Sequence, residues 1–208
     1  MTVRRVIFDL DGTLIDSVPG IVLTLTRAFE AVVPGHPLPP LALFVGPPVA
    51  RMIPTIAPEL SAATHAAVLA AFRQRYDGDG WRDVVPLPGA LETLRALADA
   101  GIPADVATYK PLAPTLRILD ALGLAPLVTR VRCVDGPGGP ALDKAAMLTE
   151  LIAAAGLAPA DVVYVGDTPA DRVAARTAGT RFVAVGPEGG ALRVERVTGQ
   201  EGGKNDAC

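Results

Sequence analysis

A chain of 208 residues can form one substantial hydrophobic core, or a core with a small inserted domain. Half of the residues are hydrophobic and a fifth are charged, which indicates a soluble globular protein rather than a disordered one. The net charge of −3 supplies no broad positive field, so the composition argues against nucleic acid or an anionic membrane as a partner. A small anion that is bound locally remains compatible with this charge.

Targeting segments and disulfide patterns are not found in the sequence. No apolar stretch approaches the roughly 18 residues that a membrane span requires, so we expect neither a signal peptide nor a membrane anchor. The two cysteines, Cys133 in a strand-like segment and Cys208 at the last position, do not form a disulfide framework. We therefore expect a cytoplasmic protein in which Cys133 is a small core residue rather than a nucleophile.

The first expected element is a buried strand over residues 3–8, which is apolar apart from two arginines near its start. Asp9, Asp11 and Gly12 follow this strand directly. The chain is therefore expected to open with a strand that ends abruptly in an acidic turn.

Residues 16–82 follow a different pattern and are predicted to form a small helical cap domain inserted after the first strand. Helical periodicity is found over residues 21–33 and 62–76. The proline-rich residues 34–48 between them cannot form a regular helix, and residues 77–80 break the second helix.

From residue 83 onward, expected helices and strands alternate. The strands are expected at 103–107, 128–134, 162–165 and 181–185, and the helices at 90–100, 114–122, 144–155 and 170–178. This alternation predicts an α/β fold: a Rossmann-like, doubly wound parallel sheet with helices on both faces. The catalytic core then comprises residues 1–15 and 83–198, and the polar tail 199–208 is expected to be disordered.

Three of the expected strands end in polar or charged residues. These are Asp9 and Asp11, Thr108 and Lys110, and Asp167 and Asp171. Ligands of open parallel sheets bind beyond the carboxyl ends of the strands, so these side chains are expected to share one site. Carboxylates gathered there repel one another unless a hard cation lies among them, which indicates Mg²⁺.

Lysine is rare in this chain, with three residues against sixteen arginines. Lys110 and Lys144 each stand beside an expected strand end or helix start, whereas Lys204 lies in the polar tail. We therefore expect an ammonium group to have a function at position 144, and Lys110 is the rival for that function.

The run Asp9-Leu10-Asp11-Gly12-Thr13-Leu14 resembles the first motif of the haloacid dehalogenase superfamily, in which Asp-x-Asp-Gly-Thr-Leu ends a strand. Three further matches follow in the order of the family. Thr108 fits the second motif and Lys144 the third, while Gly166-Asp167 with Asp171 resembles the fourth, Gly-Asp-x-x-x-Asp. The resemblance extends to about residue 186, and the four motifs together are highly specific.

The resemblance implies a phosphohydrolase that forms an aspartyl-phosphate. Asp9 is then the nucleophile and Asp11 the general acid and base. Thr108 and Lys144 contact the phosphoryl oxygens. Asp9, Asp167 and the backbone carbonyl of Asp11 are the implied magnesium ligands, and Asp171 binds or orients that metal shell.

A helical insertion after the first motif resembles the subgroup that includes phosphoglycolate phosphatases and 5′-nucleotidases. It implies a magnesium-dependent phosphatase, monomeric or homodimeric, for a small phosphorylated metabolite such as phosphoglycolate or a nucleoside monophosphate. Tyr109, Lys110 and Arg51 are further candidates for substrate binding, Arg51 toward a substrate carboxylate. The chain departs from the subgroup at Tyr109, where a small or polar residue is usual, and in a shortened end after Gly190.

Other functions on this fold remain open at the level of sequence. A phosphomutase shares every core residue, and a non-catalytic binding protein can share the fold. A phosphonatase requires a lysine from the cap, and residues 16–82 contain none. A dehalogenase lacks the second acid of the first motif, which is present here as Asp11.

Overall fold

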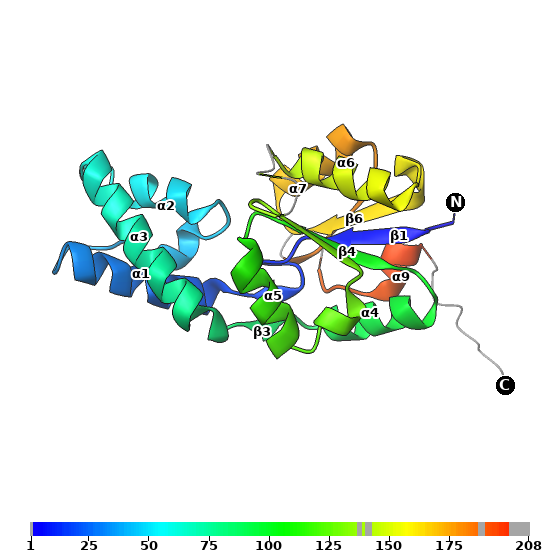
Figure 1. The fold of residues 1–208 in the computed structure, drawn as a ribbon, viewed down its shortest axis with the longest axis horizontal. Helices are drawn as coiled ribbons and strands as arrows, with labels where there is room; N and C mark the ends of the chain where they lie inside the picture. The colour runs from blue at the N-terminus through cyan, green and yellow to red at the C-terminus, as the bar shows by residue number, and fades with distance from the viewer. Residues whose placement is uncertain (1, 137–138, 140–142, 187–189, 200–208) are drawn as a thin grey trace.

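The computed structural model describes residues 2–136, 139, 143–186 and 190–199 (Figure 1). The tail that was predicted to be disordered therefore lies, apart from Gly199, outside the described residues.

The central element is a five-stranded parallel sheet with the strand order β5-β4-β1-β6-β7. Its strands are β1 (Arg5–Phe8), β4 (Ala104–Thr108), β5 (Arg130–Cys133), β6 (Val162–Gly166) and β7 (Arg181–Ala184). The three central strands are buried on both faces, as expected for strands between two helical layers. Cys133 is fully buried in β5, where burial raises the pKa of its thiol to about 11, so it is the core residue that the sequence predicts.

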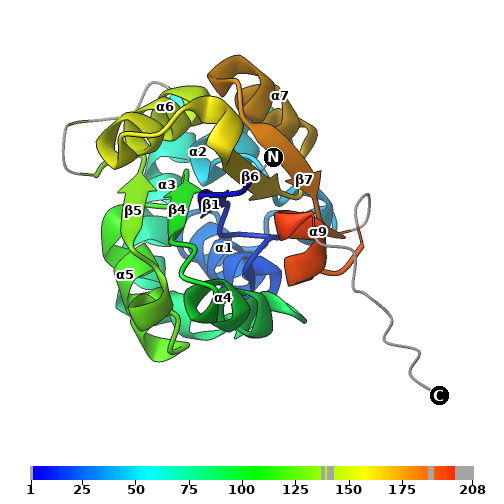
Figure 2. The same ribbon diagram turned by 90° about the vertical axis from the view of Figure 1, so that its right-hand side faces the viewer.

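Helices cover both faces of the sheet, which confirms the predicted doubly wound α/β fold (Figure 2). On one face, Val6 and Phe8 pack with residues of α4 (Ala90–Asp99), α5 (Leu112–Ala121) and α9 (Val194–Thr198). On the other face, Ile7 packs with residues of α6 (Lys144–Ala155) and α7 (Pro169–Ala178). Alternate residues of one strand thus supply two separate hydrophobic clusters.

A helical insertion follows the first strand. The short strand β2 (Ile15–Asp16) pairs antiparallel with β3 (Val85–Pro86), and α1 (Val18–Val32), α2 (Val49–Ile56) and α3 (Ala62–Gly78) lie between them. These helices have a hydrophobic cluster of their own, and Figure 1 shows them as a separate layer beside the carboxyl ends of the sheet strands. The arrangement is that of a core with a cap, and the cap boundaries at residues 16 and 82 stay a prediction.

Several short elements were not predicted. They are α2, the strand pair β2 and β3, the five-residue helix α9, and the 3-10 turns η1 (Leu41–Phe44), η2 (Gly80–Arg82), η3 (Ala125–Leu127) and η4 (Pro159–Asp161). The hydrophobic periodicity of the sequence does not predict α2, because this helix is short, follows Pro48 and contains Pro54. Among the described helices, none is long and apolar enough to cross a membrane.

Candidate active site

The expected site residues lie at the carboxyl edge of three adjacent strands. Asp9 follows β1, Thr108 ends β4, and Asp167 follows β6, and β1 pairs with both β4 and β6. This edge faces the helical insertion (Figure 1). The sheet order therefore brings together residues that lie far apart in sequence.

The loop after β1 is held against Asp167 by a tight turn. The backbone N–H of Gly12 donates to the carbonyl of Ile15 at 2.9 Å, and Gly12 has a φ of +77°. A Cβ atom at this position would lie 2.2 Å from Oδ2 of Asp167, so only glycine allows the loop to approach so closely. The Oγ1 of Thr13 then donates to Oδ1 of Asp167 at 3.3 Å.

Lys144 lies at the centre of the acidic cluster. Its Nζ is 2.8 Å from Oδ2 of Asp9 and 3.0 Å from Oδ1 of Asp171, and its side chain is buried. Two interactions fix the start of α6: the Asp143 side chain accepts from the N–H of Ala146, and the Lys144 N–H donates to Oη of Tyr109 at 3.1 Å. The ammonium group thus reaches the carboxylates from a rigid helix start.

Asp171 uses its whole acceptor capacity within the protein. Its Oδ1 accepts from Lys144 and from Oη of Tyr164 at 2.7 Å, and its Oδ2 accepts from the N–H and Oγ1 of Thr168 at 3.1 and 2.5 Å. A carboxylate offers about four acceptor positions, and these four bonds occupy them. Asp171 is also part of the capping box that starts α7.

Burial and charge act in opposite directions on these acids. Burial raises the pKa of Asp9 to about 7, although the Lys144 ammonium favours its ionised form. Burial also raises the pKa of Asp167, and the charge of Asp171 adds to this. For Asp171, burial is outweighed by Lys144 and by the hydrogen bonds from Thr168 and Tyr164, so its pKa is lowered. Of these three acids, Asp171 is therefore the one whose ionised form the protein itself favours.

Asp11 and Lys110 form a second pair beside this cluster. The Nζ of Lys110 donates to both carboxylate oxygens of Asp11, at 2.9 and 3.2 Å. Burial of Lys110 opposes its charge, but the Asp11 carboxylate outweighs this effect and raises the pKa of the lysine. The Lys110 N–H also donates to Oγ1 of Thr108 at 3.1 Å, and no acceptor for the hydroxyl hydrogen of Thr108 is found among the described residues.

The two lysines thus hold different acids. Lys144 neutralises Asp9 and Asp171, whereas Lys110 holds Asp11, so the structure separates two residues that were rivals for one function. Arg51 is exposed on α2, and no side-chain contact of Arg51 with the acidic edge is found in the part of the chain that the structure describes. Sequence reasoning missed Tyr164 and Thr168; the Thr168-Pro-Ala-Asp171 run carries a helix-capping signal, but Tyr164 carries none.

The acidic edge offers a set of oxygens suited to a hard cation. One carboxylate oxygen from each of Asp9, Asp167 and Asp171 can be chosen so that all lie within 4.8 Å of one another. Magnesium prefers one or two carboxylates together with water and substrate oxygens. Because Asp171 is saturated by protein donors, Asp9 and Asp167 are the carboxylates with oxygens left for a metal.

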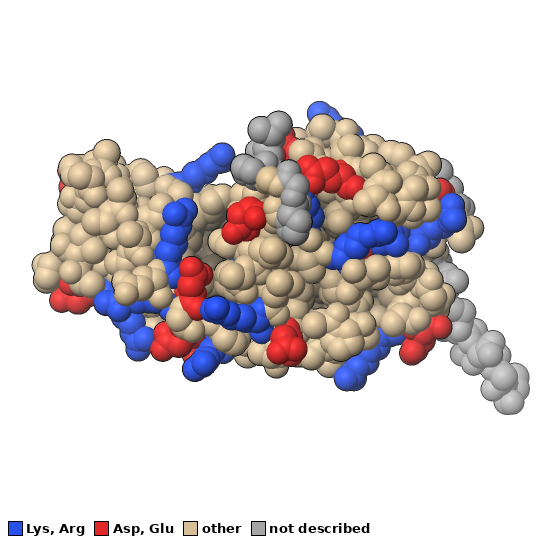
Figure 3. All heavy atoms as spheres, viewed as in Figure 1, with Lys and Arg blue, Asp and Glu red and all other residues tan. Residues whose placement is uncertain are grey.

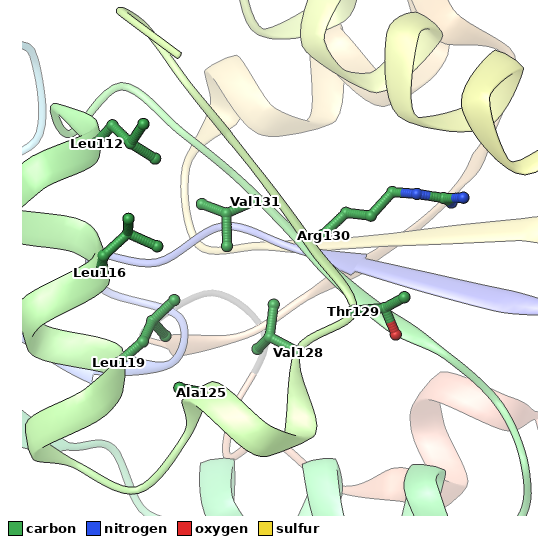
Figure 4. A pocket seen from close by; sticks show the side chains of 8 residues that line it. All are labelled: Leu112, Leu116, Leu119, Ala125, Val128, Thr129, Arg130 and Val131. Atoms are coloured by element: carbon green, nitrogen blue, oxygen red, sulfur yellow. The ribbon is translucent and has the colours of Figure 1, made fainter. Parts of the chain in front are cut away.

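A hollow of about 380 Å³ lies elsewhere, beside the outer strand β5 (Figure 4). It is lined by Leu112, Leu116 and Leu119 of α5 and by the segment 128–131, and the Arg130 side chain points away from it. Its walls are mostly apolar, so it does not compete with the acidic edge as a site of phosphate chemistry.

Comparison with known proteins identifies the family. The family model for haloacid dehalogenase-like hydrolases matches residues 6–185. The chain belongs to this family. It is thus a haloacid dehalogenase-like hydrolase, as its four motifs predicted, and the helical insertion lies where the resemblance places a cap.

Relatives of this hydrolase are similar over most of its length. A phosphoglycolate phosphatase from Rhodospirillum rubrum is 34% identical, with 88% of this chain and 79% of that protein covered. One from Xylella fastidiosa is 35% identical, with 85% and 77% covered. A solved haloacid dehalogenase-like hydrolase from Streptococcus pneumoniae has a TM-score of 0.78 at 25% identity and covers 91% of this chain and 88% of its own.

Proposed function

We propose that this hydrolase is a magnesium-dependent phosphatase that cleaves small phosphomonoesters through an aspartyl-phosphate on Asp9. The phosphatase names of its curated relatives support the phosphomonoester reaction. The observation that carries the proposal is the position of Asp9: it lies at a strand end, Lys144 contacts its Oδ2, and its Oδ1 has no partner among the described residues. That oxygen is free to attack phosphorus.

The reaction divides between the two acid–lysine pairs. In the first step an Asp9 carboxylate oxygen forms a bond to phosphorus while the bond from phosphorus to the ester oxygen breaks, and Asp11, protonated for this step, gives its proton to that oxygen. In the second step Asp11 takes a proton from a water molecule whose oxygen bonds to phosphorus; the bond between Asp9 and phosphorus breaks, which releases inorganic phosphate and restores the Asp9 carboxylate. Lys144 offsets the negative charge at Asp9 and on the phosphoryl oxygens. The free hydroxyl hydrogen of Thr108 is available to a phosphoryl oxygen.

Magnesium fits the acidic edge. We propose that Asp9, Asp167 and the backbone carbonyl of Asp11 hold it, and that Asp171 orients Lys144 rather than binding the metal, because its four acceptor positions are already used. Bound there, the ion supplies the positive charge that lets an anionic nucleophile approach an anionic phosphate.

The substrate is proposed to be phosphoglycolate or a similar small ester, with nucleoside monophosphates as the alternative. The relatives named above support the first choice. The helical cap over the acidic edge is the element that selects among such esters, and Arg51 on α2 is its candidate for a substrate carboxylate. On the molecular face drawn in Figure 3, acidic and basic side chains both occur, and several basic side chains lie side by side on its right.

A panel of phosphomonoesters tests this proposal. Purified enzyme is incubated with magnesium and each ester, and released phosphate is measured for the wild type and for Asp9→Asn. We expect the highest kcat/KM with phosphoglycolate or a similar ester and no turnover by Asp9→Asn. Hydrolysis by Asp9→Asn at more than about a hundredth of the wild-type rate is inconsistent with a nucleophilic Asp9.

A further inference from the structure

The last turn of α3 in the cap is attached to the core at two points. The Nη1 of Arg117, on α5, donates to the backbone carbonyl of Asp77. One residue earlier, the ring of Tyr76 lies against Lys110, with Nζ 4.9 Å from the ring centroid. Figure 1 shows the end of α3 beside α5. Tyr76 is thus a cap residue that contacts the acid–lysine pair of the core.

Lys110 is enclosed between one carboxylate and one aromatic ring. Its side chain is 5% exposed, its ammonium donates to both oxygens of Asp11, and the Tyr76 ring covers another side. A cation within about 6 Å of a ring centroid is attracted by the ring, more strongly where water is excluded. Burial raises the pKa of Tyr76, so its ring is neutral and does not compete with Asp11 for the charge.

We propose that Tyr76 is a positioning residue through which the cap orients the catalytic acid: its ring fixes Lys110, and Lys110 fixes Asp11. This inference rests on the proposed function, in which Asp11 protonates the leaving group. It assigns the last turn of α3 a function beyond enclosing the substrate. Where α3 contacts the core, Asp11 is held by a fixed donor, so the position of the cap and the orientation of the acid are linked.

The ring of Tyr76 makes the cation–π contact with Lys110. The Oη atom is buried and has no hydrogen-bond partner among the described residues. Phenylalanine at this position keeps the ring and removes an unsatisfied polar atom, which costs little or nothing in stability. Leucine keeps a buried apolar side chain but removes the ring.

Phe72 provides a matched control. It lies one turn earlier on α3, is 6% exposed against 4% for Tyr76, and stacks on Tyr76 with ring centroids 5.2 Å apart. No contact between Phe72 and Lys110 is found in the described part of the chain. Phe72→Leu therefore removes a ring of similar burial from the cap without removing the ring on Lys110.

The test compares two leaving groups. The alkoxide of phosphoglycolate requires a proton to leave, whereas p-nitrophenolate leaves without one, so a misplaced acid affects kcat/KM for the first ester alone. We expect Tyr76→Leu to lower kcat/KM for phosphoglycolate by roughly tenfold or more, part of the 10²–10⁴ that a general acid contributes, while p-nitrophenyl phosphate changes little. Tyr76→Phe is expected to restore the loss, and Phe72→Leu to affect both esters equally. If Tyr76→Leu lowers both esters equally, or Tyr76→Phe fails to restore activity, the inference is wrong.

A second arm tests whether Tyr76 acts through Lys110. In a Lys110→Met background, Tyr76→Leu is expected to cause no further loss, because the residue that it positions is gone. A further loss of the same size as in the wild type contradicts the inference.

Lysine-labelled protein supplies a readout that needs no activity. The chain has three lysines, and Lys144 lies 5.2 Å from the ring of Tyr109, so it serves as an internal reference. Tyr76→Leu is expected to shift the NMR signal of the Lys110 ammonium and leave that of Lys144 in place. An unchanged Lys110 signal excludes the contact. If Tyr76→Leu shifts the Lys110 signal but the wild type has no phosphatase activity that depends on Asp9, the proposed function is wrong, and the positioning role is wrong with it.

Discussion

Replacement of Lys144 by methionine separates the electrostatic contribution of this lysine from its packing. Methionine keeps an unbranched side chain of similar length and removes the ammonium that lies 2.8 Å from Asp9 and 3.0 Å from Asp171. The side chains of Lys144, Asp9 and Asp171 are 8%, 8% and 1% exposed, so water does not replace the lost charge. Breaking a buried ion pair by removing one partner costs about 3–5 kcal/mol.

This loss predicts a large change in the thermal stability of the metal-free enzyme. At about 2–4 °C per kcal/mol for a chain of this size, Tm falls by roughly 6–20 °C. In the proposed site, magnesium bound by Asp9 and Asp167 would return part of the missing positive charge, so saturating metal is expected to restore part of the loss. Turnover stays low with metal, by roughly 3 kcal/mol of barrier, because the charge beside the phosphoryl group is missing.

Lys110→Met is the matched control for stability. It removes the same group, but its partner Asp11 has a side chain that is 32% exposed, so water solvates the remaining charge. We therefore expect a smaller loss, measured by thermal and urea unfolding in chelator and then in magnesium. Equal losses for the two variants, or a Lys144→Met protein as stable as the wild type in chelator, refute this account of the cluster.

Three further predictions concern the same edge. The pKa of Asp9 is about 7 in the folded protein against an ordinary value of 3.8, so the folded state binds more protons than the unfolded state between these values. The contribution of Asp9 to the stability of the metal-free enzyme should therefore fall as pH rises from 3.8 to about 7. A free energy of unfolding, measured with urea, that rises over this range contradicts the assignment. Gly12→Ala should weaken magnesium binding and cost about 1–3 kcal/mol of stability, because the added Cβ meets Asp167 and the φ of residue 12 is positive. A variant that binds magnesium as tightly as the wild type in a calorimetric titration contradicts this role of the turn. Calcium should inhibit, because its looser shell misplaces the attacking Asp9, and phosphate release at the same rate with either ion tells against that geometry.

The sequence predicts the sheet and the positions of the acids because these depend on local patterns. Mostly apolar segments that end at Asp9, Thr108 and Gly166 predict both a strand and the site at its end. The parallel sheet then brings these strand ends together without further information from the side chains. Such patterns do not predict α2, which is short and contains a proline, or β2, which has only two residues.

The pairing of acids with lysines depends on contacts that no local pattern contains. Lys110 reaches Asp11 across 99 residues of sequence, and Tyr76 contacts Lys110 from helix α3 of the helical insertion. The scarcity of lysine and a position beside a strand end made Lys110 a rival of Lys144, and the structure places each beside a different acid. The roles of these residues, the cytoplasmic location and the monomeric or homodimeric state stay predictions.

Trapping the covalent intermediate tests the central claim most directly. Wild-type enzyme is mixed with magnesium and phosphoglycolate, quenched in acid within one turnover, digested, and mapped by mass spectrometry. We predict one added phosphoryl group on the peptide that contains Asp9, lost on treatment with hydroxylamine and absent from Asp9→Asn. Phosphate release by an enzyme that carries the phosphoryl group on another residue, or never carries one during turnover, contradicts nucleophilic attack by Asp9.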